Sequence, residues 1–306
     1  MAGFPDALRP LGATSVGVAI DRRAYCRIEK TPAGVRVESK DSLLKIEVAR
    51  AADLSREGLP ALVRHVLLAL GVESGMHLVT QARVPFDAGL GSERALAVAV
   101  AASAARALGR AAAPEDLCGL LRDLPGQPGG GVDAFVAAWG GVAAAPIDHK
   151  GGVAAELLRV DPARVEECLL LVDPGSGAMS SASADEGLVR AALGEIAAGA
   201  LRVRAALVAG RASSITGLVA AEHEAWRRLG LVAPEGAVEA IAHLARAAGG
   251  AARLCGRGPK SLVLVWAEPG EGREGPKEAV VEALKAAGYR TFPCRLDLRG
   301  LEVEEA

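Results

Sequence analysis

The stretch VPFDAGLGSERALAVAV, residues 84–100, constrains the fold and function of this chain more than any other feature. Gly89, Gly91 and Ser92 stand immediately before an alanine-rich run. A helix leaves the N–H groups of its first turn without partners, and glycines let a ligand approach them closely. Because the helix dipole adds positive potential there, the stretch predicts an anion-binding loop, most often for phosphate. The residues alone also allow a tight turn in which Ser92 caps the helix.

The segments ahead of this loop predict strands and one helix. LPALVRHVLLALG (59–71) has apolar residues at helical spacing and ends in glycine, and MHLVTQARV (76–84) is typical of a strand. Residues 13–48 contain short β-branched runs interrupted by turn-forming residues. These runs predict three or four antiparallel strands.

Helices dominate the second half of the chain. A helix is expected from Pro114, and residues 185–248 have a helical period interrupted near Gly210, Gly230 and Pro234. Residues 168–174, 261–267 and 289–298 predict strands, and residues 276–288 predict a helix. This order indicates an α+β fold with two packed lobes, and the length of 306 residues predicts two domains, 1–150 and 151–306.

The composition argues against several classes of function. The formal net charge is −2 and aromatic residues make up 3%, so neither a basic field nor base-stacking platforms for nucleic acid are expected. The start of the chain lacks the pattern of a secretory signal, and the apolar runs are too short to span a membrane, so a cytoplasmic protein is expected. The five cysteines contain no C-x-x-C pair, which argues against a zinc site and a disulfide framework.

The string P-x-x-x-G-L-G-S, from Pro85 to Ser92, resembles the phosphate-binding loop of the GHMP kinases, the superfamily of galactokinase, homoserine kinase and mevalonate kinase. GQPGGGVDAFVAAWGG (126–141) resembles a segment of the branch that phosphorylates D-glycero-D-manno-heptose 7-phosphate and related sugars. GGAARLCGRGPKSLVLVW (249–266) resembles the third family motif. The resemblance implies a two-lobe GHMP fold, with an N-terminal lobe like domain 2 of ribosomal protein S5 and a ferredoxin-like C-terminal lobe.

The resemblance also implies where ATP binds. The nucleotide phosphates are expected at the glycine loop and at the third motif, which helps to close the phosphate site. Arg94 is expected either to contact phosphate or to lie on the solvated face of its helix. The expected nucleotide-binding residues are Pro85, Gly89, Leu90, Gly91, Ser92, Arg94, Gly256, Arg257, Gly258 and Lys260.

Asp133 occupies the position of the catalytic aspartate of the family, where it would orient or deprotonate an acceptor hydroxyl. An aspartate in a glycine-rich loop is also explained by hydrogen bonds to turn N–H groups. The acceptor is expected at Gly130, Gly131, Ser180 and Ser181. The two serines, with Ser183, fit the cap of the following helix equally well.

The family holds Mg²⁺ with a serine hydroxyl and a carboxylate. Ser92 matches the hydroxyl, but the alignment puts Leu121 where the carboxylate belongs. Glu93 follows Ser92, so the carboxylate ligand is either relocated to Glu93 or lost. In the second case Glu93 only favours the helix dipole and repels phosphates.

Three features depart from the family pattern. The first family motif should precede Ala13, but residues 1–12 do not fit it, and Arg9 is the one candidate for its basic residue. Pro259 removes a backbone donor from the third motif. Without the first-motif strand the first sheet would have an exposed edge, which suggests a homodimer as a hypothesis. His223 is expected at the surface, and Trp139 and Trp226 are expected to be packing residues.

The leading interpretation is a kinase that transfers the γ-phosphate of ATP to a sugar or sugar-phosphate hydroxyl. The first alternative is a catalytically degenerate relative that binds a ligand as a regulator or assembly partner. Its support is the missing first motif, Leu121 and the altered third motif. The second alternative is a non-kinase enzyme of the same fold, similar to the ribofuranosyl-aminobenzene phosphate synthases.

Overall fold

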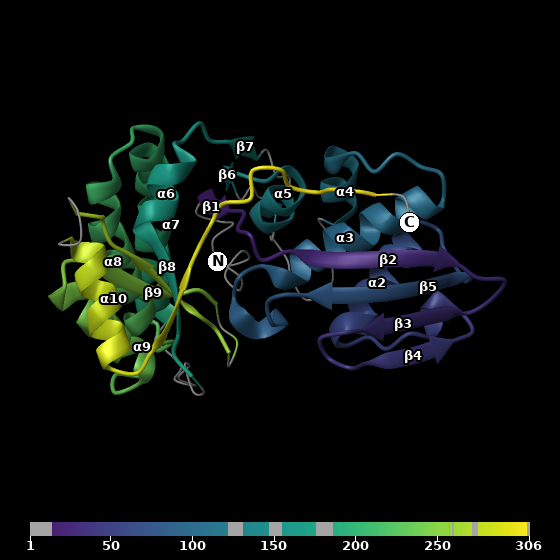
Figure 1. Cartoon of the computed structure of the whole chain (residues 1–306), viewed down its shortest axis with the longest axis horizontal. Helices are drawn as coiled ribbons and strands as arrows, with labels where there is room; N and C mark the ends of the chain where they lie inside the picture. Colours follow the sequence, from purple (N-terminus) through teal and green to yellow (C-terminus); the bar gives the residue numbers. More distant parts are fainter. Residues whose placement is uncertain are drawn as a thin grey trace.

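The computed structural model describes residues 14–121, 131–146, 155–175, 186–256, 258, 260–270 and 275–304. Figure 1 shows two parts side by side, one around β2 to β5 and the other around β8, β9 and the later helices, with β1 and β6 between them. Three sheets and their covering helices make up the described chain. The prediction of an α+β fold is therefore confirmed.

The first part is built on a four-stranded sheet of order β2-β5-β3-β4. β2 (Ala24–Lys30) pairs antiparallel with β5 (Met76–Ala82), and β3 (Val35–Ser39) pairs antiparallel with β4 (Lys45–Val48). β3 runs parallel to β5, and β1 joins a different sheet. The four expected strands before residue 48 are present, and each has an antiparallel partner. Only β3 and β4 pair with each other, because strand partners depend on crossovers that a local pattern does not encode.

Helices α2 (Gly58–Ala69), α3 (Ser92–Ala107) and α4 (Pro114–Leu121) cover this sheet. The 3-10 turns η2 (Ala51–Asp53) and η3 (Phe86–Ala88) precede α2 and α3. α3 is buried on most sides, and its alanines let neighbouring elements approach closely. The core of this part joins Leu67, Leu78, Leu96 and Leu121 with the alanines of α3.

A small sheet of order β1-β6-β7 connects the two parts. β1 (Thr14–Val18) pairs antiparallel with β6 (Val142–Pro146), which also pairs with β7 (Glu156–Leu157), and α5 (Gly131–Trp139) precedes β6. One apolar cluster joins Val142 and Ala144 of this sheet to Leu171, Ile215 and Trp266 of the second part. This cluster therefore joins the small sheet to the second part.

The second part is a four-stranded antiparallel sheet of order β11-β8-β10-β9. Its strands are β8 (Leu169–Asp173), β9 (Ala251–Leu254), β10 (Val263–Trp266) and β11 (Arg290–Pro293). Its helices are α6 (Pro162–Cys168), α7 (Glu186–Val208), α8 (Ala212–Arg228), α9 (Ala237–Ala247) and α10 (Pro276–Ala286). The strand order is that expected of a ferredoxin-like lobe.

Two residues of α8 test the expectations for single side chains. Trp226 is fully buried in the core of the second part, which confirms its packing role. His223 is only 1% exposed, so its expected place at the surface is wrong. Its Nε2 lies 3.0 Å from the carboxylate of Glu239 on α9. A buried imidazole is tolerated there because the neighbouring helix supplies a polar partner.

The end of the described chain returns to the first part. Ile20 forms an isolated antiparallel bridge with Leu296, and the Asp297 N–H donates to the Ala19 carbonyl at 3.0 Å. The Leu301 N–H donates to the carbonyl of Ala138 on α5 at 3.0 Å. Residues 297–304, here called the C-terminal segment, therefore lie against β2 and α5 (Figure 1). The boundary between domains near residue 150 stays a prediction.

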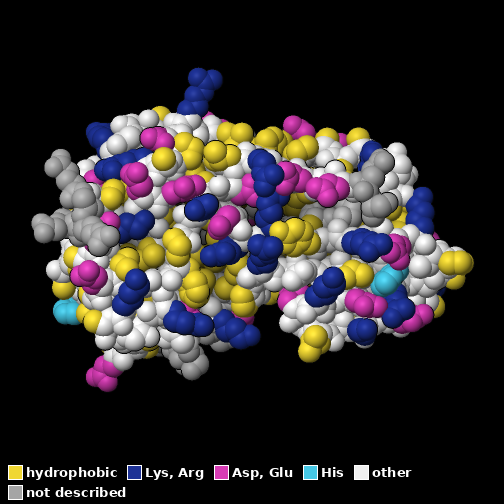
Figure 2. Space-filling model, viewed as in Figure 1, with side chains coloured by type: hydrophobic (Ala, Val, Ile, Leu, Met, Phe, Trp, Pro, Cys, Tyr) yellow, Lys and Arg dark blue, Asp and Glu magenta, His cyan; other side chains and the backbone are white. Residues whose placement is uncertain are grey.

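Figure 2 shows that Lys and Arg side chains on this face are mixed with Asp and Glu side chains. Among the described helices, none is both long enough and apolar enough to cross a membrane.

Candidate active site

The glycine loop sits between β5 and α3, as the sequence predicts. Gly89, after η3, and Gly91, the N-cap of α3, have φ values of 75° and 70°, a left-handed conformation that favours glycine. Among the described residues, no hydrogen-bond acceptor is placed for the amides of Gly89 to Glu93. These amides and the helix dipole together form a site for an anion. The alternative that Ser92 caps α3 is wrong, because the N-cap is Gly91 and no side chain caps it.

The turn after β9 closes on this loop. A Cβ built on Gly89 would lie 2.5 Å from the Gly256 nitrogen, and one built on Gly258 would lie 2.3 Å from the Asp87 carbonyl oxygen. The Leu262 N–H donates to the Ala88 carbonyl at 3.0 Å. Segments about 170 positions apart in the sequence thus meet backbone to backbone, which only glycines permit here. Next to this contact, the Nζ of Lys260 lies 4.0 Å from the Asp87 carboxylate.

Asp133 lies beside the glycine loop. It is in the first turn of α5, which begins at Gly131. A Cβ built on Gly91 would lie 3.3 Å from the carboxyl carbon of Asp133, so the carboxylate packs directly against the loop. An anion on the loop amides would therefore have this carboxylate as a neighbour.

A cavity of about 870 Å³ reaches this point. Leu90, Gly91 and Asp133 lie at it, and it continues along α3 between β2 and the C-terminal segment. This volume is within the range of pockets that hold small molecules. The cavity therefore joins a candidate anion site and a candidate general base to a space for a second ligand.

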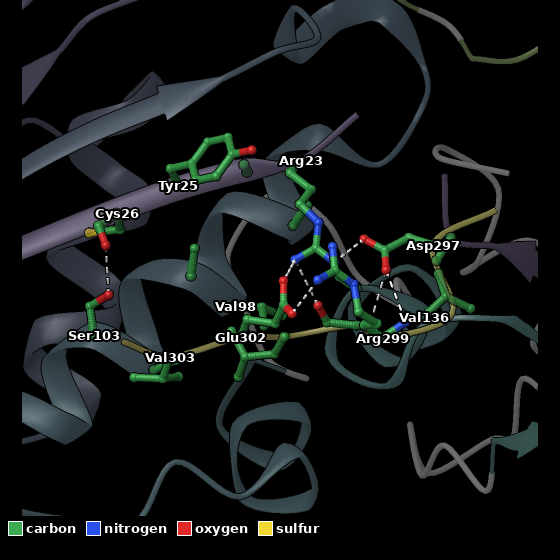
Figure 3. Close-up of a pocket in the computed structure, with 18 of the residues that line it drawn as sticks. Arg23, Tyr25, Cys26, Val98, Ser103, Val136, Asp297, Arg299, Glu302 and Val303 are labelled. Carbon is green, nitrogen blue, oxygen red and sulfur yellow. Dashed lines mark hydrogen bonds and ion pairs between the residues drawn. The ribbon is translucent and has the colours of Figure 1, made fainter. Parts of the chain in front are cut away.

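No pattern in the sequence indicates that the C-terminal segment forms a wall of this cavity. Arg23, at the start of β2, points toward this segment (Figure 3). Its guanidinium forms ion pairs with Asp297 at 2.5 Å and with Glu302 at 2.7 Å, and donates to the Gly300 carbonyl at 3.2 Å. No local pattern signals this contact, since the partners are more than 270 residues apart.

Comparisons with known proteins agree with this geometry. Residues 57–141, which contain the glycine loop and Asp133, match the model of the GHMP kinases N-terminal domain. Residues 57–141 are thus similar to the N-terminal domain of the GHMP kinases. The resemblance deduced from Pro85 to Ser92 is therefore confirmed.

Solved structures extend the similarity to the whole GHMP kinase fold. A D-glycero-D-manno-heptose 1-phosphate kinase from Bacteroides thetaiotaomicron matches with a TM-score of 0.74 at 18% identity, covering 97% of this chain and 92% of that one. A Lactococcus lactis galactokinase complexed with galactose matches with a TM-score of 0.72 at 12% identity, covering 98% and 92%. The Methanococcus jannaschii mevalonate kinase matches with a TM-score of 0.65 at 14% identity, covering 97% and 95%. The search of curated proteins found no significant match.

Arg94 is buried, so one of the two expectations for it is wrong. Its side chain is 2% exposed, which rules out the solvated face of the helix. The expected contact with phosphate stays a prediction. Its Nη1 donates to the Leu121 carbonyl at 2.7 Å. Burial lowers the pKa of Arg94, and the nearby charges of Asp133 and Glu93 oppose that effect. The cause is local: α3 is buried on the side that carries Arg94.

The residues expected to hold Mg²⁺ do not fit that ion. The Ser92 hydroxyl donates to the Pro85 carbonyl at 2.8 Å, and Leu121 is a fully buried apolar side chain. Burial raises the pKa of Glu93, while Arg94 lowers it and Asp87 raises it. No group of three or more metal-ligating side chains occurs in the described part of the chain. The carboxylates near the loop have a buried guanidinium as their neighbour, and a divalent cation would compete with that charge.

Several expected site residues lie outside the described residues. They are Gly130, Ser180, Ser181 and Arg257, together with Arg9, Ser183 and Pro259.

Proposed function

We propose that this protein is a kinase that transfers the γ-phosphate of ATP to a hydroxyl of a sugar or sugar phosphate. The observation that carries the proposal is the contact between the glycine loop and Asp133 at one end of the cavity. Support comes also from the sugar kinases among the solved structures with this fold. The amides of Gly89 to Ser92 would bind the nucleotide phosphates, and the acceptor would occupy the cavity.

The chemistry proposed for these residues follows from their positions. Phosphoryl transfer needs positioning and charge stabilisation more than covalent chemistry. Fixed loop amides at a helix N-terminus can stabilise the negative charge of the transferring group. Asp133 would accept the proton of the acceptor hydroxyl as that oxygen attacks the phosphorus. The cavity wall carries both charges, with Arg23 and Arg299 beside Asp297 and Glu302, which suits a polar acceptor.

The test is production of ADP from ATP with a panel of monosaccharides and sugar phosphates. For the accepted sugar, Asp133→Asn should lower kcat by about 10²- to 10⁴-fold, the usual contribution of a general base. ADP affinity should change by less than about threefold, because the loop amides remain. Asp116→Asn is the matched control, since Asp116 is exposed in the first turn of α4 and should leave kcat unchanged.

Two other outcomes would contradict the proposed kinase activity. ADP binding without turnover on any sugar would favour the ligand-binding alternative. Binding of a phosphoribosyl donor without ATP binding would favour the synthase-like alternative.

A further inference from the structure

Arg94 puts a permanent positive charge directly behind the glycine loop. It belongs to the first turn of α3, three positions after the N-cap Gly91. Its guanidinium is buried and donates to the Leu121 carbonyl. Because the Arg94 side chain is only 2% exposed, a ligand on the loop would feel its charge without touching it. Because an arginine side chain does not lose its proton in proteins, the charge is fixed.

Among the described residues, carboxylates from two elements act on the charge of Arg94. Glu93 precedes it on α3, and Asp133 lies on α5, where its carboxylate packs against Gly91. Both carboxylates act electrostatically on Arg94, and Asp87 of η3 acts on Glu93. Burial of the guanidinium costs free energy unless negative charges lie close to it. The same attraction stabilises the charged form of the carboxylates. Without Arg94, a polyphosphate on the loop would face these carboxylates without the buried charge that offsets them.

We propose that Arg94 is a built-in counter-ion of this site, which offsets Glu93 and Asp133 so that the loop binds a nucleotide polyphosphate without a divalent cation held by the protein. The proposal rests on the proposed function and specifies its cofactor requirement. It agrees with the poor fit of Ser92, Glu93 and Leu121 to Mg²⁺. Arg94 acts here as a positioning residue, through charge rather than contact.

The test is calorimetric titration of ADP into the full chain, once in EDTA and once in excess Mg²⁺. The wild type should bind with dissociation constants that differ by less than about threefold between the two buffers. Arg94→Gln should weaken binding in EDTA by about tenfold, which corresponds to about 1.4 kcal/mol. Mg²⁺ should recover most of that loss, an effect that a merely structural defect would not produce. Arg94→Lys keeps the charge and should stay close to the wild type.

Arg110→Gln is the matched control for Arg94→Gln. Arg110 lies just beyond the other end of α3 and also donates to a backbone carbonyl, that of Leu70 at 2.9 Å, but it is exposed. This variant should bind ADP as the wild type does in both buffers.

Glu93→Gln keeps the proposal testable if Arg94→Gln does not fold. A counter-ion site loses one repulsive charge in this variant, so ADP should bind more tightly in EDTA. If Glu93 instead held a metal ion, the same variant would weaken binding in Mg²⁺. Weaker binding of ADP by Glu93→Gln in Mg²⁺, or wild-type binding of ADP that requires Mg²⁺, would overturn the counter-ion proposal. Either result would leave the proposed kinase activity unaffected. Absence of ADP binding in both buffers would overturn both.

Discussion

Gly89 and Gly256 meet at the glycine loop with no space for a side chain on either. Gly89 has a left-handed φ of 75°, and a Cβ on it would overlap the Gly256 backbone at 2.5 Å. The loop amides keep their direction only while this contact holds. At the residue scale, this contact is the strictest requirement of the candidate site.

Gly89→Ala should therefore remove ADP binding and destabilise the fold. The expected loss is about 2–4 kcal/mol, the sum of overpacking and left-handed strain. Gly109→Ala is the control, because Gly109 has a similar φ of 72° and nothing within 4 Å of an added Cβ. It should cost about 1–2 kcal/mol from strain alone and leave ADP binding intact. Urea denaturation measures the free energy of unfolding, and titration measures the affinity for ADP. Equal effects of Gly89→Ala and Gly109→Ala would contradict the steric argument.

The sequence predicts the individual motif residues of the site, but it does not predict which residues surround them in the fold. Gly89, Gly91 and Asp133 follow from string matches, since short-range chemistry fixes their spacing. The burial of Arg94 was missed because a single arginine in an alanine-rich helix gives no sign of which side is covered. His223 was misplaced for the same reason, since its partner Glu239 belongs to another helix.

At the scale of elements, the C-terminal segment is held by ion pairs to Arg23, just before β2, and by backbone hydrogen bonds to Ala19 and Ala138. The ion pair of Arg23 with Asp297 is largely shielded, with side chains 20% and 10% exposed. Removal of one partner from such a pair leaves the other charge poorly solvated. Arg23 is therefore expected to stabilise this cavity wall together with the backbone hydrogen bonds.

Arg23→Ala should loosen the C-terminal segment and cost about 1–3 kcal/mol, less than for a fully buried pair. Hydrogen exchange should rise over residues 297–304 and stay unchanged in α3. The control is Arg27→Ala on β2. The side chains of Arg27 and Glu29 are 64% and 53% exposed, so their ion pair should contribute less than about 1 kcal/mol. If the segment keeps its protection in Arg23→Ala, Arg23 is not what holds it.

Elements with a strong period were found from sequence, and elements that depend on tertiary pairing were not. α2, α3, β5 and the three long helices α7, α8 and α9 follow from apolar spacing and glycine stops. β6 was missed because the sequence VAAAP has little strand propensity, and its pairing with β1 makes it a strand. The parallel pairing of β3 and β5 could not be deduced from either strand alone.

At the scale of the whole molecule, the candidate site exists because distant segments converge. η3 and α3, the turn after β9, α5 and the C-terminal segment all meet at or near one cavity. Within the described chain, β2 and β4 are the edge strands of their sheet, and the homodimer stays a prediction. The family motifs indicated three of these segments in advance, while the cavity itself needed the structure.

The central claim is that the amides after Pro85 bind the phosphates of a nucleotide. A crystal structure of the chain with a non-hydrolysable ATP analogue tests it most directly. We expect phosphate oxygens at about 2.7–3.2 Å from the amides of Gly89 to Ser92, with the terminal phosphate facing Asp133. A nucleotide bound elsewhere, with these amides turned away from it, would contradict the account.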